Sequence, residues 1–219
     1  YLKDKRYCSA YSLVTTGDLF GVDMCYNKIP NELNVYDHDA FMKYPGKGYV
    51  VVTDIVTGRP EYIQLKDMHE DIQAIRASAS LPMVSRNVEI NGRKYLDGGM
   101  ADSIPIKRSI KDGNEKNVVI LTRPYGYRKK PTSNIRLLKM MYKKYPGVVR
   151  CMKRRHIRYN KALDFVEKEE IAGRAFVFRP ESLVKIDRIE KDPKKLKVLY
   201  LQGYHDAAMN YELLKKFLE

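Results

Sequence analysis

Short runs of β-branched and aromatic residues, each bounded by turn residues, predict hairpins in the first half of the chain. Residues 48–56 (GYVVVTDIV) form a near-continuous apolar run, which is typical of a strand buried on both faces. Thr57-Gly58 turns this run into a partner strand at 60–65. Residues 88–97 (VEINGRKYLD) predict two more strands, joined by Asn91-Gly92, a pair that type I′ hairpin turns favour.

Amphipathic stretches predict helices between and after these strands. The pattern 67–70 (DMHE) is a capping box, which opens a helix that ends before Pro82. A short helix follows Pro105 and stops at Gly113. A final amphipathic helix is predicted at 193–219. A long helix before it is predicted from apolar positions three or four residues apart, namely Val149, Met152, His156, Tyr159, Leu163 and Val166.

The order of these elements predicts the fold class and two domains. Buried strands, which include 117–122 and 174–180, alternate with helices, and this alternation indicates an α/β protein. Residues 1–45 are rich in Gly, Pro, Asn and Asp with single apolar residues between them, so we expect turns there. We therefore predict an α/β domain at 1–130 and a mainly helical, basic extension at 131–219.

Composition narrows the class of protein. The chain has 219 residues, of which 44% are hydrophobic and 31% charged, and this balance is typical of a globular protein. No run approaches the ~18 apolar residues of a spanning helix, and no charged-then-apolar leader opens the chain. We therefore expect a cytoplasmic location, or a peripheral one at a membrane. Because the first residue is Tyr1 and not Met, we also expect an N-terminal half that precedes it.

The metal-binding and thiol residues give no pattern of a metal site. Cys8, Cys25 and Cys151 lack paired spacing, and the four histidines are scattered without an H-x-x-x-H motif. We predict three ordinary thiols in a reducing compartment and no metal site. His156 lies on the apolar stripe of the long helix, so we expect it to be buried and hydrogen-bonded.

Positive charge is concentrated in one segment. Residues 116–161 contain 15 Lys or Arg and no Asp or Glu, whereas the remaining residues carry 26 basic and 27 acidic side chains. This segment is either a solvated helix face or a surface for an anionic partner. Phospholipid headgroups, nucleic acid and an acidic protein are the candidate partners, and nucleic acid has the least support because the chain has no recognition-motif or zinc-finger pattern. The candidate binding residues are Arg150, Lys153, Arg154, Arg155 and Arg158.

A lone carboxylate stands where the second hairpin ends. Asp97 follows the strand residues Tyr95-Leu96 and precedes Gly98-Gly99. By itself Asp-Gly is a common turn with a solvated acid. An acid at a strand end, held by two residues free to adopt positive φ, can instead be presented rigidly to a cleft, and that geometry suits a general base.

Several ordered motifs resemble the later part of patatin-like lipid acyl hydrolases, in a bacterial subgroup with a predicted patatin-like esterase core. They cover nearly the whole chain: TGDLFGVDMCYNKIPNELNVYD, VVVTDIVTGRPEYI, IRASASLPMVSRNVEINGRKYLDGGMADSIPI and AFVFRPESL…KLKVLYLQGYHDA. The resemblance implies a three-layer α/β fold with flanking helices. It also implies a Ser–Asp dyad that cleaves lipid esters, needs no cofactor and uses Asp97 as proton acceptor, with Gly98 and Gly99 shaping the motif.

Two departures from that family bear on the dyad. The family's G-x-S-x-G elbow and its Gly-rich oxyanion loop, which belong to its earlier half, do not occur in these residues. We therefore expect the nucleophile to come from the missing N-terminal half of the same protein, and the substrate to be a lipid or another acyl ester. Ser103 stands where the family often has Asn. Ser78 and Ser80 are expected to bond at a helix end.

Two other functions remain open on the residues alone. The protein could be a basic α/β module that binds a membrane or nucleic acid without catalysis, with the D-G-G motif purely structural. It could also use Asp54, Asp97 and Asp102 around Mg²⁺ as a nuclease, although their spacing does not demand it. The preferred role of Asp54 is to stabilise its hairpin by accepting from the amide of Thr57 or Gly58.

Overall fold

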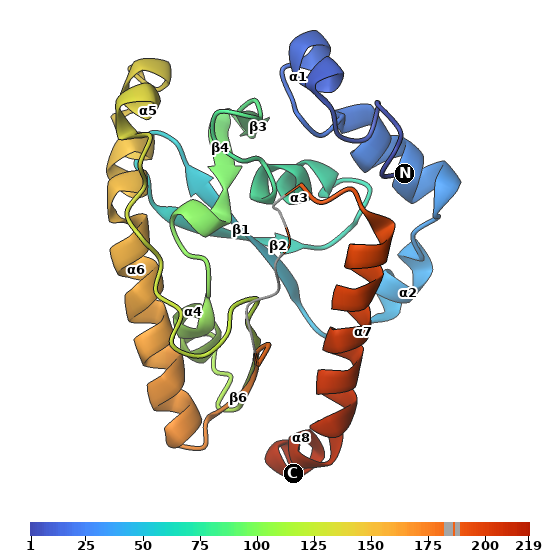
Figure 1. The fold of residues 1–219 in the computed structure, drawn as a ribbon, viewed down its shortest axis with the longest axis vertical. Helices are drawn as coiled ribbons and strands as arrows, with labels where there is room; N and C mark the ends of the chain where they lie inside the picture. The colour runs from blue at the N-terminus through green and yellow to red at the C-terminus, as the bar shows by residue number, and fades with distance from the viewer. Residues whose placement is uncertain (182–185, 187–188) are drawn as a thin grey trace. The chain divides into compact units, whose positions relative to one another are not determined.

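The computed structural model describes residues 1–181, 186 and 189–219 of a mixed α/β protein, the fold class that the sequence predicts (Figure 1). Ser182 and Leu183, at the end of one resembling motif, lie outside these residues. The chain contacts divide into two compact units. Unit 1 comprises residues 1, 3–103 and 131–158, and unit 2 comprises residues 2, 104–130 and 159–219. The predicted domain boundary after residue 130 is one point where the chain passes between units, but the segment that follows is shared by both.

Unit 1 contains a four-stranded antiparallel sheet in the order β2-β1-β4-β3. Its strands are β1 (Gly48–Asp54), β2 (Pro60–Leu65), β3 (Val88–Ile90) and β4 (Arg93–Asp97). Both predicted hairpins are confirmed, and the second turns through Asn91 and Gly92 at φ 49° and 74°, the left-handed conformations that a type I′ turn needs. Burial of β1 on both faces is confirmed only from Val52 to Asp54, because the first part of the strand stays partly exposed.

Unit 1 also contains helices before, between and after these strands. They are α1 (Ala10–Thr16), η1 (Met24–Leu33), α2 (His38–Lys43), α3 (Ile72–Ser78), η2 (Gly98–Met100), α5 (Ile135–Met141) and the first half of α6 (Pro146–Ile171). The prediction of turns in residues 1–45 is therefore wrong for three segments. η1 does not show the 3.6-residue periodicity of an α-helix, because it is a π-helix with Pro30 inside it. In this wider helix an amide donates to the carbonyl five residues earlier, as the amide of Asn34 does to Ile29.

The capping box predicted at 67–70 does not form. The carboxylate of Asp71 accepts the amides of Lys66 and Asp67 at 2.6 and 3.1 Å, and it closes a turn that precedes the helix. Asp67 accepts the amide of His69, two residues on. α3 therefore begins only at Ile72, and it packs against β1, β3 and β4.

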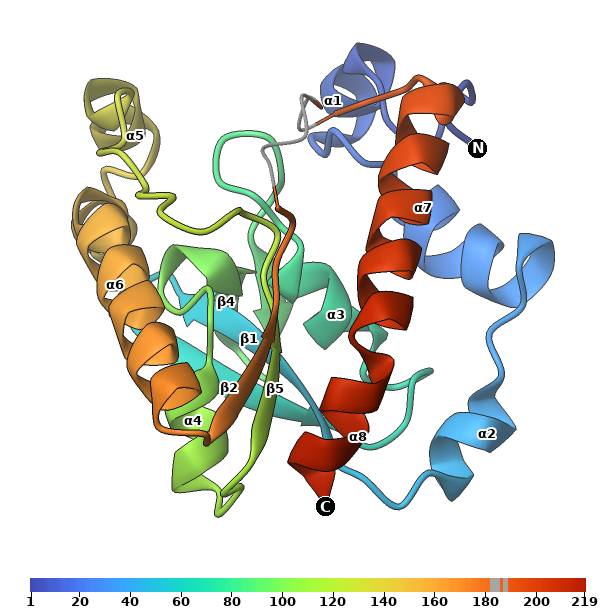
Figure 2. The same cartoon turned by 60° about the horizontal axis from the view of Figure 1, so that its bottom comes forward.

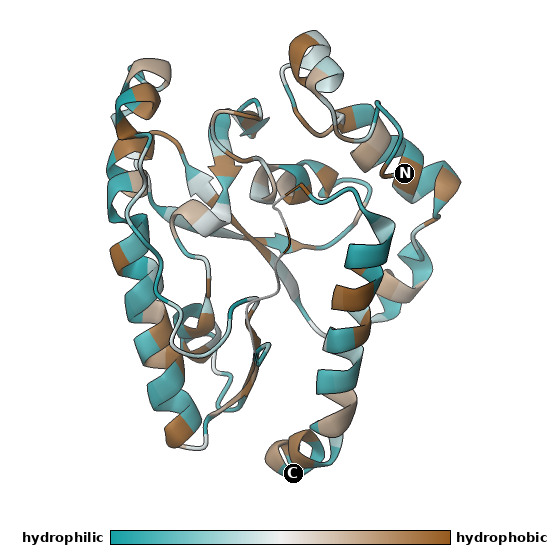
Figure 3. Cartoon of the chain, viewed as in Figure 1, coloured by the Kyte–Doolittle hydropathy of each residue, from teal (hydrophilic) through white to brown (hydrophobic). Residues whose placement is uncertain are grey.

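Two apolar clusters hold unit 1 together. One joins α3 to the sheet through Val52, Ala77, Val88 and Tyr95. The other packs the β1 and β4 ends and the η2 turn against α5 and α6, and consists of Ile55, Leu96, Met100, Ala101, Leu138, Tyr142, Val148, Val149, Cys151 and Met152. Hydrophobic and hydrophilic residues alternate along α6, as the predicted stripe requires (Figure 3).

Unit 2 is built on a parallel strand pair, β5 (Asn117–Ile120) and β6 (Ala175–Phe178), which run side by side in Figure 2. Its helices are α4 (Ile106–Lys111), the second half of α6, α7 (Pro193–Met209) and α8 (Tyr211–Leu218). The single final helix predicted at 193–219 is thus two helices. The break falls at Asn210, whose side-chain amide donates to the carbonyl of Asp206 at 2.8 Å and ends α7.

Asp54 stabilises the first hairpin as predicted, since its carboxylate accepts the Thr57 amide at 2.6 Å and an Arg93 N–H at 2.7 Å. Burial alone would raise the pKa of Asp54, but the Thr57 amide and the Arg93 guanidinium outweigh it and hold that pKa below its ordinary value.

We expect Asp54→Asn to lower the free energy of unfolding at neutral pH by about 1.5–3 kcal/mol, because two hydrogen bonds to a charged group are weakened. The difference from wild type should shrink as pH falls, since a lowered pKa stabilises the folded state only while the carboxyl is ionised. Urea unfolding from pH 3 to 7 measures both effects. Glu89→Gln is the control, because it also removes one negative charge. Glu89 is exposed and its distance of 3.9 Å from Lys94 is long, so this ion pair contributes little to stability. A pH-independent loss would contradict the ionic explanation.

Candidate active site

The backbone of Asp97 is fixed from two sides at the end of β4. Its amide donates to the carbonyl of Ser80 at 2.8 Å, and its carbonyl accepts the hydroxyl of Thr53 at 2.8 Å. Asp97 also lies opposite Val52 in the β1–β4 register. Thr53 and Val52 are fully buried, so the strand end has little freedom to move.

The two glycines after Asp97 are required for space and not for positive φ, which neither adopts. The freedom of these two residues to adopt positive φ, noted from the sequence, is therefore not used here. Gly98 starts the η2 turn so close to β1 that a Cβ would lie 2.0 Å from the carbonyl oxygen of Val51. A Cβ on Gly99 would lie 2.9 Å from Oδ1 of Asp97, the atom that accepts the Gly99 amide at 2.6 Å. Gly98 is favoured because the backbone of β1 approaches closely, and Gly99 is favoured because the carboxylate of Asp97 occupies the space of a Cβ.

Two arginines of α6 hold the other side of this turn. Arg155 Nε donates to the carbonyl of Gly99 at 2.8 Å, and an Arg158 N–H donates to the carbonyl of Met100 at 3.0 Å. Arg158 also donates to the carbonyl of Cys151, whose thiol in turn donates to Met100. Both arginines were predicted to lie on a surface for anions. The structure instead directs them to backbone carbonyls, so we remove them from that surface.

Asp97 lines a cavity of about 600 Å³ within unit 1. Most of the wall is apolar or aromatic and comes from the first 30 residues, from η1 and from the segment after α3. The lining residues are Tyr1, Tyr7, Asp18, Phe20, Val22, Cys25, Tyr26, Ile29, Arg76, Ala79, Ser80, Leu81, Ser85 and Asp97. The expected presentation of Asp97 to a hollow therefore agrees with the structure, whereas the aromatic wall was missed.

Burial raises the pKa of the Asp97 carboxyl above its ordinary value, although the Gly99 amide and the positive charge of Arg155 oppose the shift. A carboxylate with a raised pKa is a stronger base than a solvated one. It can therefore take a proton from a hydroxyl group more readily near neutral pH. No hydroxyl of the described residues donates to this carboxylate.

The nucleophilic side chains in the cavity wall are poorly placed or poorly activated. The hydroxyl of Ser80 donates to the carbonyl of Arg76 at 2.7 Å, which is the expected bond at a helix end. Burial raises the pKa of Cys25 to about 11, so its thiol stays protonated near neutral pH. Ser85 lies in the segment before β3, and not at the strand-to-helix turn that exposes a nucleophilic serine in an elbow motif.

Asp18 and Arg76 are polar groups of the cavity that sequence reasoning missed. Asp18 is buried, accepts the amide of Arg86 at 2.8 Å and lies 3.6 Å from Arg76. Nε of Arg76 is buried and has no hydrogen-bond partner among the described residues. The cavity therefore contains a cation with an unused donor. No local sequence pattern predicts the Asp18–Arg76 ion pair, because the two residues lie 58 positions apart in the chain.

The other predicted acids and His156 do not join this site. Asp54 bonds to Arg93, and Asp102 accepts the hydroxyl of Tyr62 at 2.6 Å, so the three aspartates of the Mg²⁺ alternative have different partners. No group of three metal-binding side chains occurs in residues 1–181, 186 and 189–219. His156 is partly buried, and its Nδ1 has no partner in the same residues, so the expected hydrogen bond is wrong for that atom.

The remaining three predicted cations, Arg150, Lys153 and Arg154, are exposed and line a separate hollow of unit 1. Two lysines of the α5 region, Lys139 and Lys143, line it as well. This hollow shares no lining residue with the Asp97 cavity. Sequence reasoning placed the cations of α6 but did not connect them to α5.

Comparison with known proteins shows which family one segment of the chain resembles. Residues 6–109 match the model of the family described as patatin-like phospholipase. This segment is patatin-like. It contains Asp97, both glycines and the residues of the cavity wall from Tyr7 onward, so the resemblance seen in the sequence is confirmed for the family. The narrower expectation, that only the later part of the family's domain is present, is not borne out by this match and stays a prediction.

Two further similarities concern other parts of the chain. Residues 145–219 match a second family, described as a domain of unknown function (DUF6363). A protein from Escherichia coli (strain K12), named "Uncharacterized protein YjjU", is 43% identical to this chain over 54 residues. That similarity covers 24% of this chain and 15% of the E. coli protein.

We expect Gly98→Ala to destabilise the protein by about 1–3 kcal/mol, because the added Cβ would overlap the Val51 carbonyl and force β1 and β4 apart. The matched control is Gly203→Ala in α7, where a Cβ meets no atom within 4 Å. That change should raise stability by up to about 1 kcal/mol through helix propensity. Thermal unfolding of both variants is the measurement. Equal stability of Gly98→Ala and wild type would mean that the turn is not closely packed.

We expect Asp97→Asn to be as stable as wild type, or more stable, at pH 7. The raised pKa means that folding favours the protonated acid, so the free energy of unfolding falls as pH rises from the ordinary value of 3.8 through the raised one. Asn keeps an acceptor for the Gly99 amide but carries no charge. Urea unfolding at pH 3 and pH 7 should show a variant advantage only at pH 7. A marked loss of stability at pH 7 would show that the charged form is stabilised.

Proposed function

We propose that the protein is a serine-type lipid acyl hydrolase in which Asp97 is the proton acceptor and the nucleophilic serine comes from outside these 219 residues. The observation that carries the proposal is Asp97 itself. It is a partly buried carboxyl with a raised pKa, held by its backbone at the edge of an apolar-walled cavity, and it has no hydroxyl partner among the described residues. The patatin-like match of residues 6–109 supports the same reaction class.

The proposed reaction is an acyl transfer in two halves. The serine oxygen attacks the ester carbonyl while its proton passes to Asp97, and a tetrahedral intermediate forms. The intermediate collapses, the C–O bond of the ester breaks, and the leaving alcohol takes the proton from Asp97. Water then attacks the acyl-enzyme with Asp97 again accepting a proton, and the carboxylic acid product leaves as the serine recovers its proton.

The wall of the cavity supports an apolar acyl chain as the substrate group. Phe20, Val22, Tyr26, Ile29 and Leu81 are the side chains that would contact it. Removing a chain from water into such a wall contributes about 0.8 kcal/mol for each buried CH₂ group. Arg76, with its unused Nε donor, gives the cavity a cation for an anionic part of the substrate or for a developing negative charge.

A binding module without catalysis is the second candidate function, and one observation favours it. The excess positive charge of residues 116–161 contributes five exposed cations to a hollow that is separate from Asp97. Binding and hydrolysis are compatible, because the two hollows have no residue in common. Among the described residues, no helix is long and apolar enough to cross a bilayer. The cytoplasmic location stays a prediction.

Ester hydrolysis by the full-length protein tests the proposal. We expect Asp97→Asn and Asp97→Ala to lower kcat/KM for p-nitrophenyl butyrate by about 10²–10⁴-fold, the usual contribution of a general base. The acidic limb of the wild-type pH profile should lie above the ordinary pKa of aspartate, because burial raises the pKa of Asp97. Asp102→Asn is the matched control and should keep most activity, since Asp102 bonds to Tyr62.

Three outcomes would overturn parts of this assignment. Full activity of Asp97→Ala would remove the dyad. Loss of activity in Ser80→Ala or Ser85→Ala, with unchanged stability, would place the nucleophile within these residues. Activity that requires added Mg²⁺ would favour the metal-dependent alternative.

A further inference from the structure

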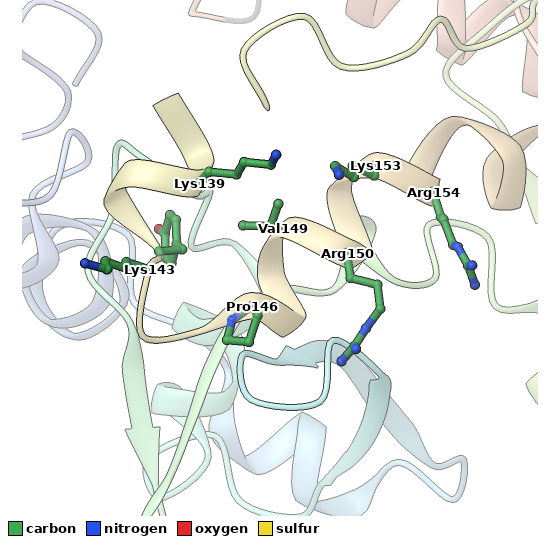
Figure 4. A pocket seen from close by; sticks show the side chains of 8 residues that line it. Lys139, Lys143, Pro146, Val149, Arg150, Lys153 and Arg154 are labelled. Atoms are coloured by element: carbon green, nitrogen blue, oxygen red, sulfur yellow. The ribbon is translucent and has the colours of Figure 1, made fainter. Parts of the chain in front are cut away.

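A hollow of about 520 Å³ lies between α5 and the start of α6 in unit 1. Five cations line it, namely Lys139, Lys143, Arg150, Lys153 and Arg154, and all five side chains are exposed. In Figure 4, Lys139 and Lys153 point toward each other above Val149, whereas Lys143, Arg150 and Arg154 point away from that pair. Like charges that converge repel one another, and an anion between Lys139 and Lys153 would offset that repulsion.

Acidic side chains do not neutralise these cations. None of the five forms an ion pair within residues 1–181, 186 and 189–219, and the 46 residues from Lys116 to Lys161 include no Asp or Glu. In the part of the chain that the structure describes, Arg150 is the one member of this set whose side chain makes a hydrogen bond, a long one of 3.4 Å to the carbonyl of Thr57. α6 begins at Pro146, which lines the hollow, so the positive end of a 26-residue helix adds to the potential there.

Part of the lining of the hollow carries no charge. Tyr142, Pro146 and Val149 form the uncharged part of the lining. On α5, Leu137, Met140 and Met141 are exposed to 40%, 71% and 50%, although none of the three lines this hollow. A free inorganic anion would leave these side chains in water. A lipid bilayer would take up both groups, since its headgroups bind cations and its interface accepts exposed Leu and Met side chains.

We propose that this basic hollow binds the phosphate of an anionic phospholipid at a bilayer surface, with the exposed apolar residues of α5 entering the interface. Each cation near an anionic bilayer contributes about 1 kcal/mol. Residues 116–161 carry all of the excess positive charge that would attract an anionic bilayer, because the remaining residues have a net charge of −1. The proposal does not depend on the acyl hydrolase reaction, since binding is measured without turnover.

Vesicle co-sedimentation of the full-length protein tests it. We expect binding to vesicles of phosphatidylcholine with phosphatidic acid, weak binding to phosphatidylcholine alone, and a steep loss as salt rises. Lys153→Gln/Arg154→Gln should weaken binding about 25-fold, which is about fivefold for each lost charge. Lys139→Gln/Lys143→Gln, on the other flank, should act similarly, which guards against a folding defect in one variant. Asp97→Asn should bind as wild type does.

The control variant removes the same number of positive charges, two, from residues that do not line the hollow. Lys144 and Lys161 are exposed, and neither lines it, so Lys144→Gln/Lys161→Gln should weaken binding less than threefold. Equal losses in control and test variants would show a general charge effect and overturn the pocket. Tight binding to neutral vesicles would overturn the ionic explanation.

Two competition arms separate the lipid from other anions. Millimolar inorganic phosphate should displace no more protein from vesicles than sodium chloride of equal ionic strength. Greater displacement would assign the hollow to free phosphate. A single-stranded or duplex oligonucleotide that binds more tightly than vesicles, with the same dependence on Lys153 and Arg154, would assign it to nucleic acid.

Discussion

The contact between the Gly98 backbone and the carbonyl of Val51 fixes the geometry of the candidate active site. It brings the end of β4 onto β1 so closely that no side chain fits, and the hydrogen bonds of Asp97 to Ser80 and Thr53 hold the same strand end. The carboxylate therefore has a rigid base, and its position does not depend on the mobility of a surface loop. The cost is an acid kept partly out of water, which appears as its raised pKa.

Local patterns in the sequence predict much of unit 1. Asn91-Gly92 specifies a hairpin turn with little dependence on the rest of the fold, and the β-branched run from Gly48 requires a partner strand. Asp97 could be located because it follows such a strand directly. The stripe of α6 is also visible, since its period is that of an ordinary helix. These features depend on residues that are close together in the sequence, so a single sequence is sufficient to predict them.

Features that depend on distant contacts could not be predicted. The apolar residues of η1 look like isolated anchors, because Pro30 and the wider hydrogen-bond ladder disturb the 3.6-residue period. The sequence predicts Arg155 and Arg158 as members of an anion-binding surface on α6, and only the fold reveals the carbonyls of Gly99 and Met100 beside them. The hollow beside α5 likewise joins cations from two helices. Counting charges along the sequence identifies the basic segment 116–161, whereas the fold determines which of its cations line the same hollow.

The bonds from Arg155 and Arg158 also connect the two segments that match separate families. Gly99 and Met100 belong to the patatin-like segment, residues 6–109, and the arginines belong to the segment that matches the domain of unknown function, residues 145–219. The boundary between the matches is therefore not a boundary of the fold. A protein trimmed to the first match would lose both arginine donors to the acid-bearing turn, and the Gly99 carbonyl would keep only the hydroxyl of Ser103. The segment that matches the second family therefore contributes part of the scaffold on which the first depends.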